Sequence, residues 1–245
     1  MSSTSTAIAV IPARLGSTRL ARKVLREIAG KPMVQRVYEA ARRCPLLHDV
    51  IIATDADEVM QLAQSHGWKA RMTSSSHRSG TDRVNEVAQA IPADVYVNIQ
   101  GDLPLLRPEQ IEALLSPMQR SHVHVSTVKT LCRPEEISNP NAVKVVTDRN
   151  GRALYFSRST IPYDRDRAGI IPFKHLGLYA YRKAALERFC SLPESRLEAA
   201  ERLEQLRLLE SGIDIYVEET PFGSVEVDTE EDLKKVEELL RAQGG

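Results

Sequence analysis

The sequence predicts an α/β fold of Rossmann type with a mainly parallel central sheet. Short, almost wholly apolar runs at residues 7–11 and 95–99 are typical of strands that are buried on both faces. Amphipathic segments with helical spacing separate such runs along the chain, and strands that alternate with helices form parallel sheets with right-handed crossovers. The 245 residues are sufficient for one α/β domain with a core of its own.

The other elements follow from the same patterns. A helix begins near Pro32, with Met33, Val37 and Ala40 on one face. Further strands are predicted at residues 50–53, 68–72, 123–129, 139–147, 153–156, 175–182 and 213–217, and further helices at 58–65, 84–90, 108–119 and 197–209. The segment 148–151 is predicted to be the turn of a hairpin.

The composition limits the classes of function. Lys and Arg number 33, as do Asp and Glu, so the formal net charge is zero and no excess of cations is available to hold a nucleic acid or an anionic membrane. The first residues contain no basic region, and the apolar run after them is too short for a signal sequence or a membrane span, which predicts a cytoplasmic protein. Cys44, Cys132 and Cys190 are widely spaced and lack a metal-binding pattern, so we expect buried thiols.

A loop of small and basic residues follows the first predicted strand. In α/β sheets the loops at the carboxyl ends of strands bind the ligand. The loop matches neither the dinucleotide fingerprint nor a Walker A sequence, which leaves a phosphate site made of backbone N–H groups and long cations, or simply a solvated basic loop. Its residues are Arg14, Gly16, Ser17, Thr18, Arg19, Arg22 and Lys23.

Asp102 is the best candidate for a metal ligand. It follows the predicted strand 95–99 in the sequence Gln100-Gly101-Asp102, so it should lie in the crevice that faces the basic loop. Mg²⁺ prefers carboxylate and phosphate oxygens as ligands. A turn Asp beside a Gly is the structural alternative.

These segments and several later ones resemble the sugar nucleotidyltransferases, and specifically the family of CMP-Kdo synthetase (3-deoxy-manno-octulosonate cytidylyltransferase). The matching sequences are PARLGSTRL at 12–20, GKPM at 30–33, HRSGTDR at 77–83, QGD at 100–102, NPNAVKVV at 139–146, ALYFSR at 153–158, HLGLYAYR at 175–182, LEQLR at 203–207 and VDTEEDL at 227–233. They occur in the order typical of the family and extend over nearly the whole chain.

The resemblance implies a Rossmann-like nucleotidyltransferase with a small dimerisation lobe. Residues 1–245 would form a single cytidylyltransferase domain, with a nucleotide-binding part at about 1–125 plus 213–245 and a sugar-binding and dimerisation lobe at about 126–212. A homodimer is therefore expected. Tyr155 and Phe156 suit either the dimer surface or the core.

The resemblance also implies an activity. The family transfers CMP from CTP to the anomeric hydroxyl of 3-deoxy-manno-octulosonate (Kdo), giving CMP-Kdo and pyrophosphate for lipopolysaccharide synthesis, with Mg²⁺ as cofactor. The expected partners are the small molecules CTP and Kdo, with no nucleic acid and no membrane.

The family's site residues transfer to matching positions of this sequence. The catalytic set is Lys23, Arg14, Asp102 and Asp228, and the metal ligands are Asp102 and Asp228. The nucleotide-binding set is Pro12, Ala13, Arg14, Gly16, Ser17, Thr18, Arg19, Lys23, Ser79, Gly80, Thr81 and Arg83. The substrate-binding set is Gln100, Arg158, His175, Tyr181, Glu204 and Gln205.

Several of these residues also have structural explanations. Thr81 or Asp82 can cap the following helix, which leaves Arg83 to contact the base or an acidic neighbour. Alternation places His175, Gly177, Tyr179 and Tyr181 on one face of a strand, where a buried, hydrogen-bonded His and Tyr pair is as good an explanation as sugar recognition. Leu203, Leu206 and Leu209 form an apolar stripe, so the LEQLR sequence also suits an ordinary surface helix. Thr229 caps the last helix with Asp232 as its capping-box partner, and this cap does not use Asp228.

The chain departs from the family pattern at four positions, one of which is Arg22 in place of a glycine of the basic loop. Leu103 replaces an acid, and Ala21 and Val24 replace prolines of the basic loop, which should make that loop more flexible in the free protein. Two alternatives to the implied activity remain: a cytidylyltransferase for an amino-Kdo or a nonulosonic acid, and a weakly active CTP-binding paralogue. A Rossmann oxidoreductase is excluded because the glycine fingerprint is missing.

Overall fold

The structure is a computed structural model that describes residues 6–16 and 20–243. Two compact units divide the chain: unit 1 comprises Met1–Ile111 and Ser224–Gly245, and unit 2 comprises Glu112–Gly223. The division suggested by the sequence, near residues 125 and 212, differs from this one. At the second boundary the reason is that strand β11 (Tyr216–Glu219) pairs with β7 (Val125–Leu131), so residues 213–223 belong to unit 2.

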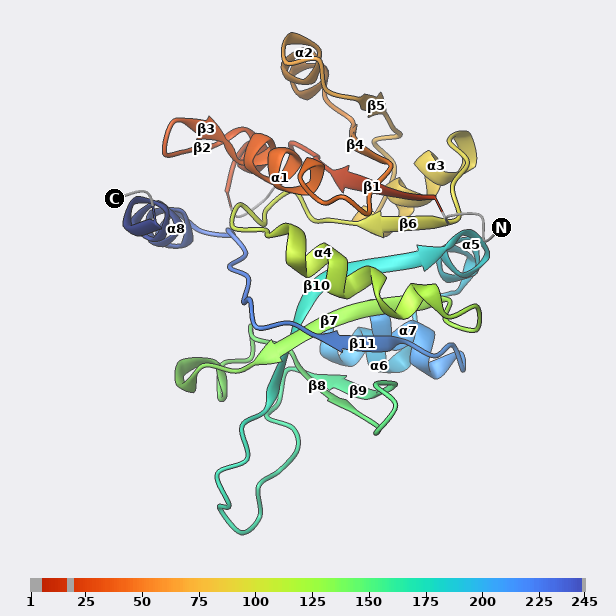
Figure 1. Cartoon of the computed structure of the whole chain (residues 1–245), viewed down its shortest axis with the longest axis vertical. Coiled ribbons are helices and arrows are strands. Elements are labelled where there is room, and N and C mark those ends of the chain that lie inside the picture. Colours follow the sequence, from red (N-terminus) through yellow and green to blue (C-terminus); the bar gives the residue numbers. More distant parts are fainter. Residues whose placement is uncertain (1–5, 17–19, 244–245) are drawn as a thin grey trace. The chain divides into compact units, whose positions relative to one another are not determined.

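Unit 1 contains a wholly parallel sheet with the strand order β6-β1-β4-β5 (Figure 1). Its strands are β1 (Ala7–Pro12), β4 (Asp49–Thr54), β5 (Ala70–Met72) and β6 (Val95–Asn98). In the centre of the sheet Ala9 pairs with Val50 on one side and with Val97 on the other. The apolar runs are buried as predicted, which confirms the parallel α/β class.

Helices connect the strands of unit 1. They are α1 (Met33–Arg42), α2 (Asp57–Ser65) and α3 (Gly80–Ala90), and α4 (Pro108–Leu115) contains the boundary between the units. The predicted inner face of α1 is confirmed, because Met33, Val37 and Ala40 are all buried. A 3₁₀ turn, η1 (Lys23–Leu25), and a short hairpin, β2 (Glu27–Ile28) with β3 (Lys31–Pro32), precede α1. Strands of two residues carry no periodicity, so the sequence did not predict this hairpin.

The last helix, α8 (Glu230–Gln243), returns to unit 1. Its buried Leu233 and Val236 share one apolar cluster with Val227, which precedes the helix, and with Leu20, Ile28 and Met33 of the N-terminal segment. The predicted capping box is confirmed: the backbone N–H of Asp232 donates to Oγ1 of Thr229 at 3.2 Å, and the N–H of Thr229 donates to Oδ2 of Asp232 at 2.9 Å. The cap fixes the chain immediately after Asp228.

Unit 2 contains a mixed sheet around the central strand β7 (Figure 1). Strand β11 lies parallel to β7, and β10 (Phe173–Arg182) lies antiparallel to it. Strand β8 (Lys144–Thr147) pairs with β10 and forms the predicted hairpin with β9 (Ala153–Ser157). Phe156 is buried in the core of the unit, whereas Tyr155 is partly exposed.

The helices of unit 2 differ from the prediction, which contained no helix at residues 183–191 and one unbroken helix at 197–209. They are α5 (Lys183–Ser191), α6 (Arg196–Glu201) and α7 (Gln205–Glu210), with 3₁₀ turns η2 (Pro117–Gln119) and η3 (Pro134–Glu136). The single helix predicted over residues 197–209 is wrong, because Arg202 has a left-handed backbone with φ 55° that ends α6. As a result Leu208 is buried and Leu209 is only partly buried.

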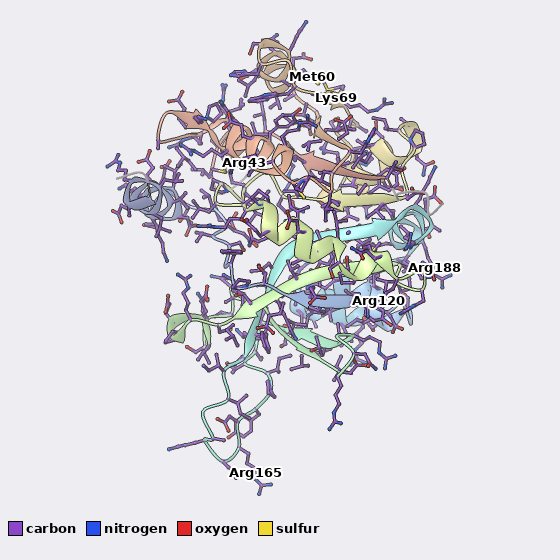
Figure 2. All side chains as sticks on the ribbon, in the orientation of Figure 1. Arg43, Met60, Lys69, Arg120, Arg165 and Arg188 are labelled. Atoms are coloured by element: carbon purple, nitrogen blue, oxygen red, sulfur yellow. The ribbon has the colours of Figure 1, made fainter. Side chains whose placement is uncertain are left out.

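The structure also bears on the cysteines and on the predicted lack of a membrane span. Cys44 and Cys132 are buried free thiols, and Cys190 is a half-buried one. In the part of the chain that the structure describes, every helix is too short or too polar to cross a lipid bilayer. Figure 2 shows Arg165 at the tip of the loop that joins β9 to β10 in unit 2.

Candidate active site

Lys23 joins two aspartates of unit 1 that are distant in the sequence. Its Nζ donates to Oδ2 of Asp102 at 2.6 Å and to Oδ1 of Asp228 at 2.9 Å. The exposed fractions of the three side chains are 14%, 20% and 24%, respectively. We call these residues the Lys23–Asp102–Asp228 cluster. The structure thus brings together three of the four predicted catalytic residues.

Backbone contacts hold the two aspartates beside each other. The N–H of Val227 donates to the carbonyl oxygen of Asp102 at 3.1 Å, and the N–H of Asp228 donates to Oδ2 of Asp232 at 3.1 Å. On the other side, a Cβ atom on Gly101 would lie 2.8 Å from the carbonyl oxygen of Pro12. Only glycine permits this close approach between the end of β1 and the segment that carries Asp102.

The charges of the cluster stabilise one another. Burial alone would lower the pKa of Lys23, but the charges and hydrogen bonds of Asp102 and Asp228 outweigh this effect and raise the pKa above its usual 10.5. Lys23 therefore carries a full positive charge at neutral pH. Among the described residues, Oδ1 of Asp102 is one of the buried side-chain atoms that have no hydrogen-bond partner.

The unpartnered oxygen fits a site for a hard cation. A buried carboxylate oxygen without a partner is energetically costly, and Mg²⁺ binds such oxygens. The described ranges contain no cluster of three or more His, Cys, Asp and Glu side chains that could hold a metal by itself. Mg²⁺ commonly uses one or two carboxylates together with substrate phosphates, so a pair of aspartates is sufficient.

The basic loop is described only in part. Pro12 ends β1, and Ala13 is buried, with its N–H donating to the carbonyl oxygen of Ala53 at 2.8 Å. Arg14 and Gly16 are exposed. The predicted phosphate ligands Ser17, Thr18 and Arg19 lie outside the described residues.

The N-terminus of α3 corrects the predicted cap. The helix begins at Gly80, and its cap is Ser79, not Thr81 or Asp82. The hydroxyl of Ser79 accepts from the N–H of Asp82 at 3.2 Å, while Asp82 Oδ2 accepts from the N–H of Ser79 at 3.1 Å. The predicted base contact of Ser79 would thus use a hydroxyl that already caps the helix.

Arg83 has the acidic neighbour that the sequence left open. Its guanidinium is buried and donates to Oδ2 of Asp55 at 2.9 Å and to Oγ1 of Thr73 at 2.5 Å. Sequence reasoning did not select Asp55, although its place directly after β4, at the carboxyl end of a parallel strand, is a usable signal. The hydrogen bond to Asp55 holds the guanidinium of Arg83 in place inside unit 1.

Gln100 is held in place by a chain of amide and hydroxyl groups. Its Nε2 donates to Oδ1 of Asn98 at 3.2 Å, and Nδ2 of the buried Asn98 donates to Oγ1 of Thr81 at 3.5 Å. A Cβ atom on Gly80 would lie 3.3 Å from Oε1 of Gln100. The nucleotide-binding candidates of α3 and the substrate-binding candidate Gln100 are therefore neighbours.

In unit 2 the predicted shared face of β10 is confirmed for three aromatic residues. A bulge shifts the register after Leu176, but by two residues, so His175, Tyr179 and Tyr181 pair with alternate residues of β7 and stay on one side. The ring centroids of His175 and Tyr179 are 5.4 Å apart, and those of Tyr179 and Tyr181 are 5.7 Å apart. Gly177 lies inside the bulge.

His175 is a buried histidine that is neutral at physiological pH. Its Nε2 lies 2.9 Å from Oγ1 of Thr127, and the ring of Phe156 contacts it edge-on. Burial lowers its pKa from 6.5 to about 3. The structural explanation for His175 thus applies, and any role in sugar recognition must be that of an uncharged group.

Arg158 is bound to backbone oxygens of the same unit. Its Nε donates to the carbonyl oxygen of Glu201 at 2.7 Å, and its Nη1 donates to that of Pro140 at 3.0 Å. Glu204 lies at the N-terminus of α7, and Gln205 is the buried first residue of that helix. Gln100 belongs to unit 1, and the other substrate-binding candidates belong to unit 2.

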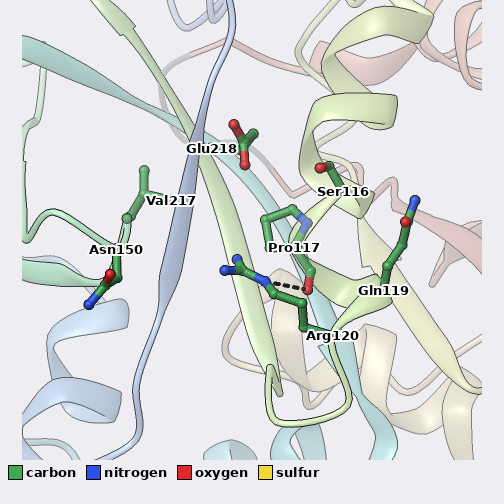
Figure 3. A pocket seen from close by; sticks show the side chains of 8 residues that line it. Ser116, Pro117, Gln119, Arg120, Asn150, Val217 and Glu218 are labelled. Atoms are coloured by element: carbon green, nitrogen blue, oxygen red, sulfur yellow. Dashed lines mark hydrogen bonds between the residues drawn. The ribbon is translucent and has the colours of Figure 1, made fainter.

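A cavity of about 470 Å³ lies elsewhere in unit 2 (Figure 3). Its lining residues are Ser116, Pro117, Gln119, Arg120, Asn150, Gly151, Val217 and Glu218. Figure 3 shows the guanidinium of Arg120 directed at the carbonyl oxygen of Pro117, which it contacts at 3.5 Å. This lining includes none of the predicted site residues.

The fold is that of a nucleotidyltransferase: a solved structure titled CMP:2-keto-3-deoxy-manno-octonic acid synthetase complexed with CTP matches 98% of this chain and 100% of its own, with a TM-score of 0.94 and 45% identity. The family model described as Cytidylyltransferase matches residues 8–215.

Two relatives are 64% identical to this chain, and both carry the name 3-deoxy-manno-octulosonate cytidylyltransferase. The protein of Koribacter versatilis (strain Ellin345) aligns over 97% of this chain and 91% of its own length. That of Acidobacterium capsulatum aligns over 95% and 96%, respectively. The chain therefore belongs to the cytidylyltransferase family and, within it, to the 3-deoxy-manno-octulosonate cytidylyltransferases.

Proposed function

We propose that this chain is an enzyme that transfers CMP from CTP to the anomeric hydroxyl of Kdo, giving CMP-Kdo and pyrophosphate. The observation that carries the proposal is the Lys23–Asp102–Asp228 cluster, in a chain 64% identical over most of its length to relatives of that name. The cluster supplies cationic and acidic groups for phosphoryl chemistry and no covalent nucleophile. Such a set suits direct displacement at phosphorus.

In this reaction the sugar hydroxyl attacks the α-phosphorus of CTP. A new oxygen–phosphorus bond forms, the bond to the β-phosphate breaks, pyrophosphate leaves, and the hydroxyl proton passes to solvent. The ammonium of Lys23 and the guanidinium of Arg14 neutralise charge on the triphosphate and on the leaving pyrophosphate. The backbone around Gly80 borders the base, and Arg83 fixes α3 through Asp55.

We further propose Mg²⁺ as the cofactor, with Asp102 and Asp228 as its protein ligands. The support is the buried, unpartnered Oδ1 of Asp102 beside the carboxylate of Asp228. When bound, Mg²⁺ stabilises negative charge on the phosphate oxygens and makes the attacking hydroxyl more acidic. Asp102 and Asp228 would hold the ion, and hydrogen bonds of their own backbone fix the positions of both residues.

For the sugar we propose Gln100, Arg158, His175, Tyr181, Glu204 and Gln205 as the binding set. A guanidinium binds a carboxylate through paired hydrogen bonds, and Arg158 is the guanidinium of this set, so we assign it to the sugar carboxylate. To bind that carboxylate, Arg158 must redirect some of the donors that now contact backbone oxygens. His175 acts as a neutral hydrogen-bonding group, because its pKa is about 3.

Pyrophosphate release with CTP, Mg²⁺ and Kdo tests the proposed activity. CTP should support the reaction far better than UTP or ATP, and Kdo should be preferred to amino-Kdo and to nonulosonic acids. Equal rates with UTP would show that the base pocket is misassigned. The absence of pyrophosphate release by a folded protein that binds CTP would identify a paralogue that only binds the nucleotide.

The metal assignment has its own test. Asp102→Asn and Asp228→Asn should each lower turnover about a hundredfold or more, the scale of losing one electrostatic stabiliser. Asp57→Asn, which removes an exposed acid of α2 in the same unit, is the matched control and should leave turnover unchanged. Unchanged rates in both site variants at limiting Mg²⁺ would refute the assignment.

We also propose a homodimer formed through unit 2. The support is a group of exposed apolar side chains in this unit, among them Leu131, Leu154, Tyr163, Ile170 and Ile171. Tyr163 is 85% exposed, which is unusual for an aromatic side chain with no partner to cover it. Sedimentation equilibrium should give twice the mass of the chain, and Tyr163→Glu should shift the equilibrium toward the monomer. A monomeric wild-type protein at micromolar concentration would refute the proposal.

A further inference from the structure

The ammonium group of Lys23 lies at the position expected for the metal. Nζ of Lys23 lies between a carboxylate oxygen of Asp102, at 2.6 Å, and one of Asp228, at 2.9 Å. Asp102 and Asp228 would hold Mg²⁺ through their carboxylate oxygens, and Nζ fills the space between one oxygen of each. Two cations cannot share that space, because their repulsion is large where solvent is limited.

The ammonium has a clear role while no metal is bound. Both carboxylates are mostly buried, with exposed fractions of 20% and 24%, so two negative charges would face each other with little screening. Lys23 supplies the compensating charge. One oxygen, Oδ1 of Asp102, still lacks a hydrogen-bond partner among the described residues, so the ammonium does not satisfy all the carboxylate oxygens of the two aspartates.

The side chain of Lys23 can leave this position without a change in the fold. Its backbone is fixed in η1, where the N–H of Leu25 donates to the carbonyl oxygen of Arg22 at 2.9 Å and that of Arg26 donates to the carbonyl oxygen of Lys23 at 3.1 Å. The ammonium sits on a flexible four-carbon stem with three rotatable donors. A triphosphate is a stronger attractor for it than a pair of carboxylates, since it carries more negative charge.

We propose that Lys23 is a place-holding cation that makes metal binding depend on the nucleotide. In the free protein its ammonium fills the metal position, and the triphosphate draws it away, so that metal and nucleotide enter together. This inference rests on the proposed function, because it takes Asp102 and Asp228 as the metal ligands. It assigns Lys23 a task before the reaction, in addition to its contact with the phosphates.

The first experiment measures the binding of Mn²⁺ alone to the nucleotide-free protein by electron paramagnetic resonance. Lys23→Met should bind Mn²⁺ about tenfold more tightly than the wild type or better, because a competing unit charge has been removed from a poorly screened site. Lys23→Arg, which keeps the charge, should bind as weakly as the wild type. Lys31→Met is the matched control, since Lys31 pairs with Glu39 on the surface of the same unit, and it should not change the affinity.

Two further measurements test whether the gain in Mn²⁺ affinity comes from the Lys23–Asp102–Asp228 cluster. Asp102→Asn in the Lys23→Met background should remove the gain in affinity. CTP should increase the Mn²⁺ affinity of the wild type by a larger factor than that of Lys23→Met, because the variant has no ammonium to displace. Equal or weaker Mn²⁺ binding by Lys23→Met, or a gain that persists in the double variant, would overturn the proposal.

The second experiment uses the wild-type protein, so it does not depend on the folding of a variant. Methyl acetimidate modifies accessible amines, and mass spectrometry of the peptides gives the rate at each lysine. Labelling of Lys23 should be slow in the metal-free protein and severalfold faster at saturating Mn²⁺, while labelling of Lys31 stays constant. An unchanged rate at Lys23 would overturn the proposal even if pyrophosphate release confirms the enzyme. A failure of the proposed function would appear instead in that release assay.

Discussion

Replacement of His175 by Gln should remove a large part of the sensitivity of this protein to mild acid. The imidazole is buried in unit 2 against Thr127 and Phe156, and burial lowers its pKa from 6.5 to about 3. An unfolded chain exposes the imidazole, which then titrates near 6.5. Between these two pKa values the unfolded state binds one proton that the folded state does not bind, so stability falls as the pH falls.

The magnitude follows from the two pKa values. Each pH unit within this window changes the free energy of unfolding by about 1.4 kcal/mol per proton. Between pH 7 and pH 5 the protonation of His175 in the unfolded chain should therefore lower the stability of the wild type by about 2 kcal/mol. His175→Gln lacks this contribution, although it loses some stability at every pH because its amide fits the aromatic surroundings less well.

Urea unfolding at pH 8.5, 8, 7, 6 and 5, followed by circular dichroism, measures the difference. Above pH 7.5 the stabilities of the two proteins should run parallel, which serves as the internal control. Below pH 6.5 the wild type should lose stability more steeply, so the gap between the two proteins narrows by about 2 kcal/mol at pH 5. Parallel curves down to pH 5 would refute the assignment of a buried neutral imidazole. In that case His175 would become cationic in the folded protein at acidic pH, and the KM for Kdo should then depend on pH.

The remaining predictions concern one close backbone contact and one buried acid. Gly101→Ala should lower the free energy of unfolding by about 1–3 kcal/mol and reduce turnover, because its Cβ would lie 2.8 Å from the carbonyl oxygen of Pro12. Gly223→Ala, where the added Cβ meets nothing within 4 Å, is the control and should change stability by less than about 0.5 kcal/mol in the same urea titration. Burial by itself raises the pKa of Glu136, but hydrogen bonds from neighbouring cations prevail and lower it from 4.5 to about 2. Glu136→Gln should therefore cost on the order of 3 kcal/mol at pH 7, and the deficit should shrink as the pH falls from 4.5 toward 2, where the wild type also loses the charge. A deficit independent of pH would show that Glu136 acts through packing alone.

Arg22, one of the departures from the family pattern, has an unfavourable backbone conformation. The basic loop of this chain has Arg22 where the family has glycine, and Arg22 adopts a left-handed backbone with φ 55°. Glycine adopts this conformation without strain, whereas other residues incur about 1–2 kcal/mol. The ion pair between Arg22 and Glu58 compensates for part of that strain. Residue 22 thus adopts the left-handed conformation although it is an arginine and not a glycine.

The sequence by itself determined the class of the fold and many of its local signals. Apolar runs and helical spacing predict the parallel strands and α1, and the capping box of Thr229 and Asp232 identifies the start of α8, because periodicity and caps depend on neighbouring residues alone. The break between α6 and α7 was missed, since the left-handed backbone of Arg202 leaves no mark in the pattern of apolar residues. Motif order, rather than periodicity, indicated the family.

Only the tertiary structure decided how the site residues are used. Lys23 could be recognised as a basic loop residue, but its place between Asp102 and Asp228 depends on the return of α8 to unit 1 and on the contact of Gly101 with the end of β1. The neutral state of His175 likewise depends on burial in the core of unit 2. The physical reason is common to both cases: charge and protonation are set by groups that are close in space, and packing brings those groups together from distant parts of the chain.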